Sequence, residues 1–213
     1  NGNDPTASDT VIVIGTSGTD TVGIDMLTLD GARVTGLGPN VNIATAERLT
    51  YSGLGGGDTR TVNTPATDTN ILITPGIAPD AGSVQVDSLV PMSFQSIGAG
   101  GTLAIADAGV GGNDTLIYRG TDSADLFLVA ATSGTIDLLV GFLGFVDHID
   151  VAQTGIENLE LDGLGDSDLF TVNGPQSYAA IFLAGGDASG SQGDVANILG
   201  DGTSMDATLA KTE

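Results

Sequence analysis

Asp166 and Asp168 lie two positions apart in an acidic glycine turn, a spacing that raises the question of catalysis. Two carboxyl groups can act as acid and base, or acid and nucleophile, in glycoside hydrolysis. Aspartates in a glycine turn more often accept hydrogen bonds from their own backbone or bind calcium. We therefore expect this pair to shape a turn or hold a cation, and not to cleave a substrate.

Other catalytic groups are scarce. His148 is the single histidine and cysteine is absent, so neither a catalytic triad nor a zinc site can be assembled. A lyase acting on acidic sugars would need a basic residue near its carboxylates. The five basic residues are scattered, and only Arg119 adjoins a good acidic turn. We expect the chain not to be an enzyme, with a carbohydrate-active protein as the least favoured alternative.

Charge excludes whole classes of partner. Asp and Glu number 27 against 5 Lys and Arg, which gives a formal net charge of −22. Nucleic-acid binding needs a basic surface, and anionic membranes repel an acidic one. No apolar run reaches the ~20 residues that a membrane-spanning helix needs. Either divalent cations neutralise these carboxylates, or the surface is simply acidic and well solvated.

An internal repeat organises the sequence. Ile156–Asn173 contains two short alternating runs joined by the acidic turn Asp162–Asp168, and alternation is the period of a half-buried strand. Thr115–Val129 matches Asn158–Val172 at a shift of 43 positions, and Val11–Ile24 matches the copy at Leu49 at a shift of 38. Repeats of this length indicate stacked units that bury a shared core.

The repeat predicts an all-β fold. Two strand-turn units of ~20 residues would account for each shift, as in a right-handed parallel β-helix, or solenoid. Tandem β-sandwich domains are the alternative, because the opening copies at Asp9 and Asp114 lie 105 positions apart, near the ~100 residues of a sandwich. Aligned apolar positions form inward columns. Arg60 breaks one column, so its copy should be an end of the stack or out of register.

The chain divides into four parts on this basis. Residues 1–8 form a polar leader, 9–112 a first β block with a looser insertion at 64–112, 113–193 a second block, and 194–213 a partial third repeat. Ile136–Phe145 is the most apolar run, for which we favour a buried strand pair over an exposed association surface. A repeat that stops part-way leaves an unpaired strand edge, so we expect either that a neighbouring molecule covers it or that the chain was cut from a longer protein.

The turns resemble the glycine-aspartate nonapeptides of hemolysin-type (RTX) calcium-binding proteins. Gly109–Ile117 (GVGGNDTLI) is the nearest copy, followed by Gly15–Gly23 and Gly163–Thr171, although copies lie roughly 40 positions apart. In that family aspartates and backbone carbonyls bind Ca2+ between coils. The resemblance, with the acidic turn pair, implies the metal ligands Asp20, Asp58, Asp114, Asp125, Asp166 and Asp168, with no other cofactor.

About two thirds of the chain resembles the Gly/Asp/Thr-rich repeat regions of large bacterial surface and extracellular proteins. The segments IENLELDGLGDSDLFTVNG and NDTLIYRGTDSADLFLV carry this likeness. It implies an extracellular or cell-surface structural protein, which we expect to self-associate head to tail into a fibre or surface layer. The alternative is a calcium-dependent adhesin or spacer, with a cell-surface or glycan partner.

Overall fold

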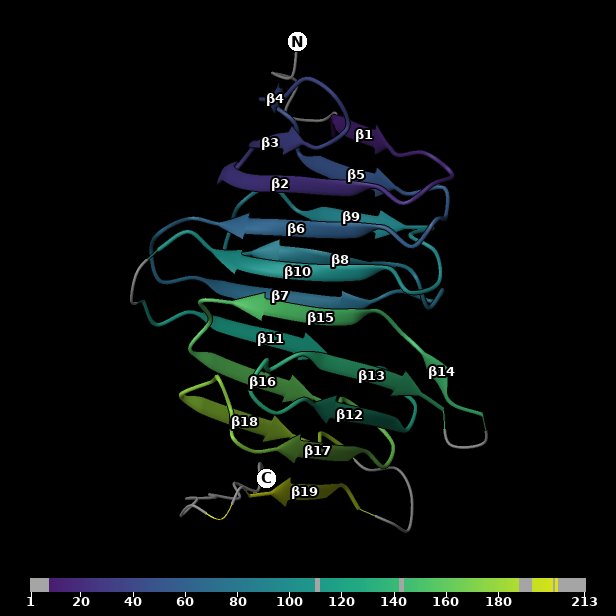
Figure 1. The fold of residues 1–213 in the computed structure, drawn as a ribbon, viewed down its shortest axis with the longest axis vertical. Helices are drawn as coiled ribbons and strands as arrows, with labels where there is room; N and C mark the ends of the chain where they lie inside the picture. The colour runs from purple at the N-terminus through teal and green to yellow at the C-terminus, as the bar shows by residue number, and fades with distance from the viewer. Residues whose placement is uncertain (1–7, 110–111, 142–143, 188–192, 201, 203–213) are drawn as a thin grey trace.

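The computed structural model describes residues 8–109, 112–141, 144–187, 193–200 and 202, and these form an all-β protein. Their 19 strands belong to two mixed sheets, here named A and B (Figure 1). Sheet A contains, in spatial order, β1 (Thr10–Ile14), β5 (Arg48–Ser52), β9 (Met92–Gln95), β8 (Gly82–Val86), β7 (Asn70–Pro75), β11 (Thr115–Arg119), β16 (Asn158–Asp162) and β18 (Ala180–Ala184).

Sheet B lies against sheet A and contains, in spatial order, β4 (Val41–Ile43), β3 (Gly31–Thr35), β2 (Thr21–Thr28), β6 (Thr59–Thr64), β10 (Thr102–Asp107), β15 (Asp150–Thr154), β13 (Ile136–Val140), β12 (Asp125–Val129), β17 (Leu169–Asn173) and β19 (Val195–Leu199). The short strand β14 (Val146–Asp147) pairs with β13. No helix of the described residues is long and apolar enough to cross a membrane.

Sequence repeats become neighbouring strands. The chain runs from a strand of sheet A to one of sheet B and back, so the next copy lies beside the previous one. Val11 pairs in parallel with Leu49, and Leu116 pairs in parallel with Leu159. These registers reproduce the shifts of 38 and 43 positions, which confirms the alignment of the repeats.

Each sheet also contains one antiparallel detour. In sheet A, β7 turns back through β8 to β9, which then pairs in parallel with β5. In sheet B, β12 turns back through β13, and the chain then enters β15, which pairs in parallel with β10. The looser tract at 64–112 therefore holds strands β7 to β10, which lie within the two sheets.

With one detour in each, the two sheets keep corresponding strands along their whole length. Setting aside β3 and β4, sheet B supplies one strand for each strand of sheet A, from β1 and β2 at one end to β18 and β19 at the other. β3 and β4 extend sheet B beyond β2, at the end nearest the N-terminus (Figure 1). Both predicted repeat blocks contribute strands to the same two sheets.

The core is aliphatic with a short aromatic stack. The aligned apolar residues predicted to face inward are buried, including Val22, Phe127 and Phe170, except for Val11 and Val13 on β1, which are half-buried. The rings of Phe127 and Phe170 stack at 5.3 Å between centroids, and Tyr118 meets Phe127 edge-on. Burying each such side chain contributes roughly 1.5–3 kcal/mol.

Arg60 overturns the prediction made for its copy. It pairs in register with Val22 on one side and Leu103 on the other, so its copy is neither an end nor out of register. Its guanidinium is fully buried, 4.8 Å from the ring centroid of Tyr51 and 5.4 Å from that of Phe94. Cation–π attraction to these two rings lets a charged residue occupy an apolar column.

The run Ile136–Phe145 is buried only in its first half. Ile136 and Leu138 on β13 are buried, whereas Phe145 is 49% exposed, and residues 142–143 lie outside the described residues. The leader 1–8 lies outside them except for Ser8, which is exposed. Of the partial repeat 194–213, the described part is β19 with its flanking residues.

Candidate functional site

The turns that lead from sheet A to sheet B, here called the A-to-B turns, carry four of the predicted aspartates as neighbouring pairs. Asp58 accepts a hydrogen bond through Oδ1 from the backbone N–H of Asp20 at 3.0 Å. Asp168 accepts the equivalent bond from Asp125 at 2.9 Å, and Asp194 accepts one from Asp168 at 3.0 Å. Each carboxylate therefore binds the backbone of the preceding repeat.

The second carboxylate oxygen closes the turn itself. Oδ2 of Asp20 accepts the backbone N–H of Thr16, and Oδ2 of Asp125 accepts that of Thr121, both at 2.6 Å. The glycine that opens the turn lies so close that a β-carbon at Gly163 would collide with the Asp168 carboxylate. The spacing from glycine to aspartate is thus explained by turn geometry.

Asp168 departs from this pattern because its Oδ2 is buried without a partner. In the turn of Asp58, the Tyr51 hydroxyl donates to Oδ2 at 3.2 Å, whereas Leu161 occupies the position equivalent to Tyr51 beside Asp168. Burial raises the pKa of Asp168 to about 7 and that of Asp125 to about 6. A buried carboxyl without a donor is favoured in its protonated form.

Asp114 lies at the opposite edge, in a turn from sheet B to sheet A. Its Oδ1 accepts the backbone N–H and the hydroxyl of Thr69, both at 2.7 Å. Its own N–H donates to the carboxylate of Glu157 at 3.1 Å, so the same bond between repeats recurs here. Sequence comparison grouped Asp114 with the other aspartates, but the structure places it apart from them.

Asp166 is half-buried in the turn before Asp168, with a φ of 67°. The structure therefore brings together Asp20 with Asp58, and Asp125 with Asp168 and Asp166, while Asp114 stands alone among the six. Across the described part of the chain, no three His, Asp or Glu side chains gather closely enough to hold a metal ion. The Oδ1 atoms of Asp58, Asp114 and Asp168 are already hydrogen-bonded to backbone N–H groups.

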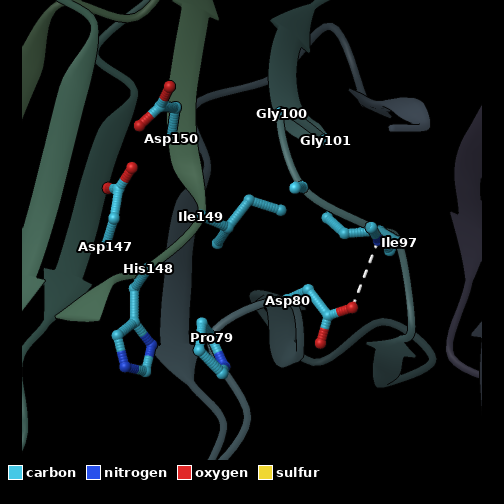
Figure 2. A pocket seen from close by; sticks show the side chains of 11 residues that line it. Pro79, Asp80, Ile97, Gly100, Gly101, Asp147, His148, Ile149 and Asp150 are labelled. Atoms are coloured by element: carbon cyan, nitrogen blue, oxygen red, sulfur yellow. Dashed lines mark hydrogen bonds between the residues drawn. The ribbon is translucent and has the colours of Figure 1, made fainter. Parts of the chain in front are cut away.

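A hollow of about 370 Å3 interrupts the A-to-B turns where the two detours meet. It lies between the turn 96–101 and the segment 147–150, with Pro79 and Asp80 along one side. Ile97 and Ile149 point toward each other across it, whereas Asp147 and Asp150 extend on the other side of their segment (Figure 2). Asp80 accepts the backbone N–H of Gly98 at 3.2 Å.

Two titratable features accompany this hollow. His148 is 8% exposed, its Nδ1 has no partner, and burial lowers its pKa. On the outer side of sheet B, Asp150 lies opposite Asp137 on the neighbouring strand, and burial, together with the nearby Asp137 carboxylate, raises the pKa of Asp150 to about 6. Two neighbouring carboxylates repel each other, which favours the protonated form of one of them. Sequence spacing missed this pair because the detour in sheet B brings the two residues together.

The end strands form a third feature. On inner strands the outward positions are either polar, as with Glu160 on β16 and Thr50 on β5, or apolar and half-buried, as with Ile117 on β11. On the end strands the large outward side chains are apolar and exposed, and Phe182 on β18 and Ile12 on β1 are 46% and 61% exposed. Val195 and Leu199 on β19 are similarly exposed.

No protein family, characterised protein or solved structure gives a significant match to this chain.

Proposed function

We propose that the two sheets form a right-handed parallel β-helix modified by the two detours. Ten strand pairs are parallel, including every pair that joins successive repeats. Crossover connections between parallel strands are right-handed in almost all proteins. Each sheet is continuous from the first repeat to the last, which favours this arrangement over tandem sandwiches.

We further propose that the protein is an extracellular structural protein that assembles through exposed β edges, with no catalysis. The observation that carries this proposal is the exposure of large apolar outward side chains on the end strands, where inner strands carry polar or half-buried ones. An unpaired edge offers free N–H and C=O groups to another chain, and soluble proteins usually protect such edges with charge. Here the outward positions of β1 and β18 carry Ile12, Ile14 and Phe182.

The buried aspartates support a structural role. Each ties one repeat to the next through a backbone hydrogen bond, which stiffens the stack along its length. Net contributions of about 1.5–3 kcal/mol are usual for hydrogen bonds to charged groups. A calcium-dependent adhesin or spacer remains the alternative, and it rests on the resemblance of the turns to calcium-binding repeats.

Electron microscopy and light scattering over a range of protein concentrations test the assembly. We expect particles that lengthen with concentration, and Phe182→Ser should reduce this lengthening. Ile77→Ser is the matched control, because Ile77 is fully exposed in the turn between β7 and β8, away from both ends. Compact single particles at every concentration, with or without millimolar calcium, would exclude the proposal. A protein that becomes structurally ordered only when calcium is added would favour the calcium-dependent adhesin or spacer.

Glycan binding in the hollow is a second candidate function, supported by the Asp80 carboxylate and the unpartnered Nδ1 of His148 beside a wall formed by Ile97 and Ile149. Carboxylates accept hydrogen bonds from sugar hydroxyls, and small-ligand sites combine apolar walls with a few polar groups. Calorimetric titration with neutral oligosaccharides should show binding that Asp80→Asn weakens and Asp162→Asn does not. Equal affinity in both variants would exclude this location.

A further inference from the structure

A row of large aliphatic side chains crosses the outer face of sheet B. Leu126 on β12 pairs in register with Leu139 on β13 on one side and with Leu169 on β17 on the other. Side chains alternate along a strand, and the neighbours of these leucines that face the core, such as Phe127, are buried. The three leucines therefore point outward, where each is half-buried. We call Leu139, Leu126 and Leu169 the leucine row.

The leucine row contrasts with other outward positions. Further along sheet B, Thr59 pairs with Thr102 on the outer side of β6 and β10. On sheet A, Leu72 on β7 has one aliphatic neighbour, Ile117 on β11, and the polar Gln85 on its other side. The leucine row is thus larger than the outward aliphatic pair of sheet A. Apolar patches that face water mark contact surfaces in soluble proteins.

Charge decides what can cover the leucine row. The outward positions of β12 and β17 are uncharged, namely Leu126, Leu128, Leu169, Thr171 and Asn173. Asp137 on β13 and Asp150 on β15 lie to one side of them. With a net charge of −22, most of the molecular surface repels a second copy. A second copy can approach closely where this uncharged face meets its own equivalent.

We propose that a second copy covers the leucine row, with sheet B packed against sheet B and a two-fold axis running along β12 between them. We call this contact the lateral dimer. The axis reverses the order of the strands, so β13 of each copy lies opposite β17 of the other. Leu126 then meets its own equivalent, and Leu139 meets Leu169 of the second copy. Sheets packed face to face lie about 10 Å apart with interdigitated side chains, and a patch that contacts itself closes as a dimer.

The neighbouring row of outward residues suits the same axis. Leu128 pairs with Asp137 on one side and with Thr171 on the other. Across the axis, Leu128 meets its own equivalent, and the Asp137 carboxylate lies opposite the Thr171 hydroxyl, which can donate a hydrogen bond. A two-fold axis running across the strands would instead set β13 against β13 and gather the acidic residues of both copies at one margin. Like charges repel, which favours the axis along β12.

The lateral dimer buries a small area. Five strands of about five residues, from β15 to β19, cover roughly 24 Å by 16 Å, or about 400 Å2 per copy. Stable complexes bury about 800 Å2 per partner, so this contact belongs to the weak class that forms at high protein concentration. It uses a sheet face and no strand edge, so it is independent of the end-to-end assembly proposed above. Within a fibre, such side-by-side contacts would repeat along the length and add together.

Single cysteine variants test the axis, because the chain has no cysteine. Leu128→Cys places two thiols opposite each other, within reach of a short bis-maleimide, and keeps the leucine row intact. Thr102→Cys is the matched control, since Thr102 is an outward residue of sheet B on β10, three strands from β12. Its two copies would lie six strand spacings, roughly 29 Å, apart. We expect a covalent dimer from Leu128→Cys and a monomer from Thr102→Cys.

Serine variants test the leucine row itself. Leu126→Ser removes a leucine from each copy at the centre of the contact, so the dissociation constant measured by sedimentation should rise by at least about tenfold. Leu72→Ser is the matched control, because it removes a half-buried leucine from the outer face of sheet A. It should leave the dissociation constant unchanged, as should Phe182→Ser, which alters an end strand.

The outcomes separate the lateral dimer from the end-to-end assembly. A covalent dimer from Leu128→Cys, with association weakened by Leu126→Ser and not by Leu72→Ser, supports the lateral dimer whether or not longer particles form. Association that Phe182→Ser abolishes and Leu126→Ser leaves unchanged overturns it and leaves edge-mediated assembly standing. Equal cross-linking of Leu128→Cys and Thr102→Cys also overturns it. A monomer at all concentrations overturns both proposals.

Discussion

The aspartates of the A-to-B turns stabilise the fold by binding backbone groups that lie 38 or 43 positions away in the sequence. Sequence comparison placed Asp20 with Asp58 and Asp125 with Asp168, and the structure joins each pair through a backbone hydrogen bond. Residue type and spacing were therefore sufficient to predict the pairs. Calcium binding by these aspartates stays a prediction, because the sequence does not show which carboxylate oxygens already accept hydrogen bonds from the backbone.

The raised pKa of Asp168 predicts a pH-dependent stability. In the folded state the pKa is about 7, against an unfolded value near 3.9, so the folded protein holds more protons between these limits. The free energy of unfolding should therefore fall as pH rises from about 4 to 7. Asp168→Asn keeps an acceptor for the N–H of Asp125 and removes the buried charge. Urea unfolding at pH 5 and 8 should show a stabilisation on the order of 1–3 kcal/mol at pH 8.

Asp122→Asn is the control for this measurement, because Asp122 is exposed in the turn that precedes Asp125. Its pH profile should match that of the unsubstituted protein. Some pH dependence of the free energy of unfolding should remain in Asp168→Asn, because the pKa values of Asp125 and Asp150 are also raised. An unchanged slope in Asp168→Asn would show that its carboxyl finds a donor in solution.

Arg60 could not be placed from sequence because its partners come from two different elements. Tyr51 lies in the same repeat, but Phe94 reaches Arg60 through the detour in sheet A. Nε and Nη1 of Arg60 have no hydrogen-bond partner, and burial lowers its pKa to about 10. The guanidinium is thus charged at neutral pH and incompletely satisfied.

Arg60→Met should therefore retain the stability of the protein to within about 1 kcal/mol, because buried charges can often be replaced by apolar groups of similar volume. Arg60→Ala should lose about 2–5 kcal/mol, since it leaves a cavity between Tyr51 and Phe94. Denaturant unfolding of both variants measures the difference. A loss in Arg60→Met as large as that in Arg60→Ala would show that the charge itself holds the two rings.

At the scale of strands, alternation predicted which side chains face inward but not the direction of each strand. The registers of β1 with β5 and of β11 with β16 follow from the repeats. The antiparallel strands β8 and β13 have the same alternating pattern as their parallel neighbours, so periodicity alone could not identify the detours. The hollow and the Asp137–Asp150 pair arise from these detours and were missed for the same reason.

The inward assignment of β17 is testable by two substitutions. Phe170→Asp places a charge against the ring of Phe127 in a buried column and should cost at least about 3–5 kcal/mol, enough to unfold the local strands. Asp166→Asn should change stability by no more than about 0.5 kcal/mol, because asparagine accepts the positive φ of this half-buried turn position. Thermal melting compares them, and equal losses would contradict the assignment.

At the scale of the whole molecule, charge opposes the association that the strand edges favour. A net charge of −22 on 213 residues makes two approaching copies repel each other. Among the described residues only Asp58, Asp114, Asp125 and Asp168 are buried carboxylates, so most of this charge lies where solution counterions can screen it. The balance between edge pairing and repulsion should therefore depend on ionic strength.

Salt should promote assembly. The Debye length falls from about 10 Å at 0.1 M to 3 Å at 1 M, so repulsion between the ends weakens over this range. The concentration at which light scattering detects assembly should decrease as NaCl is added. If screening alone acts, MgCl2 and CaCl2 at equal ionic strength should have the same effect as each other. An effect of CaCl2 well beyond that of MgCl2 would instead show that carboxylates bind calcium, as the turns predict, and assembly weakened by salt would show that the contact relies on ion pairs.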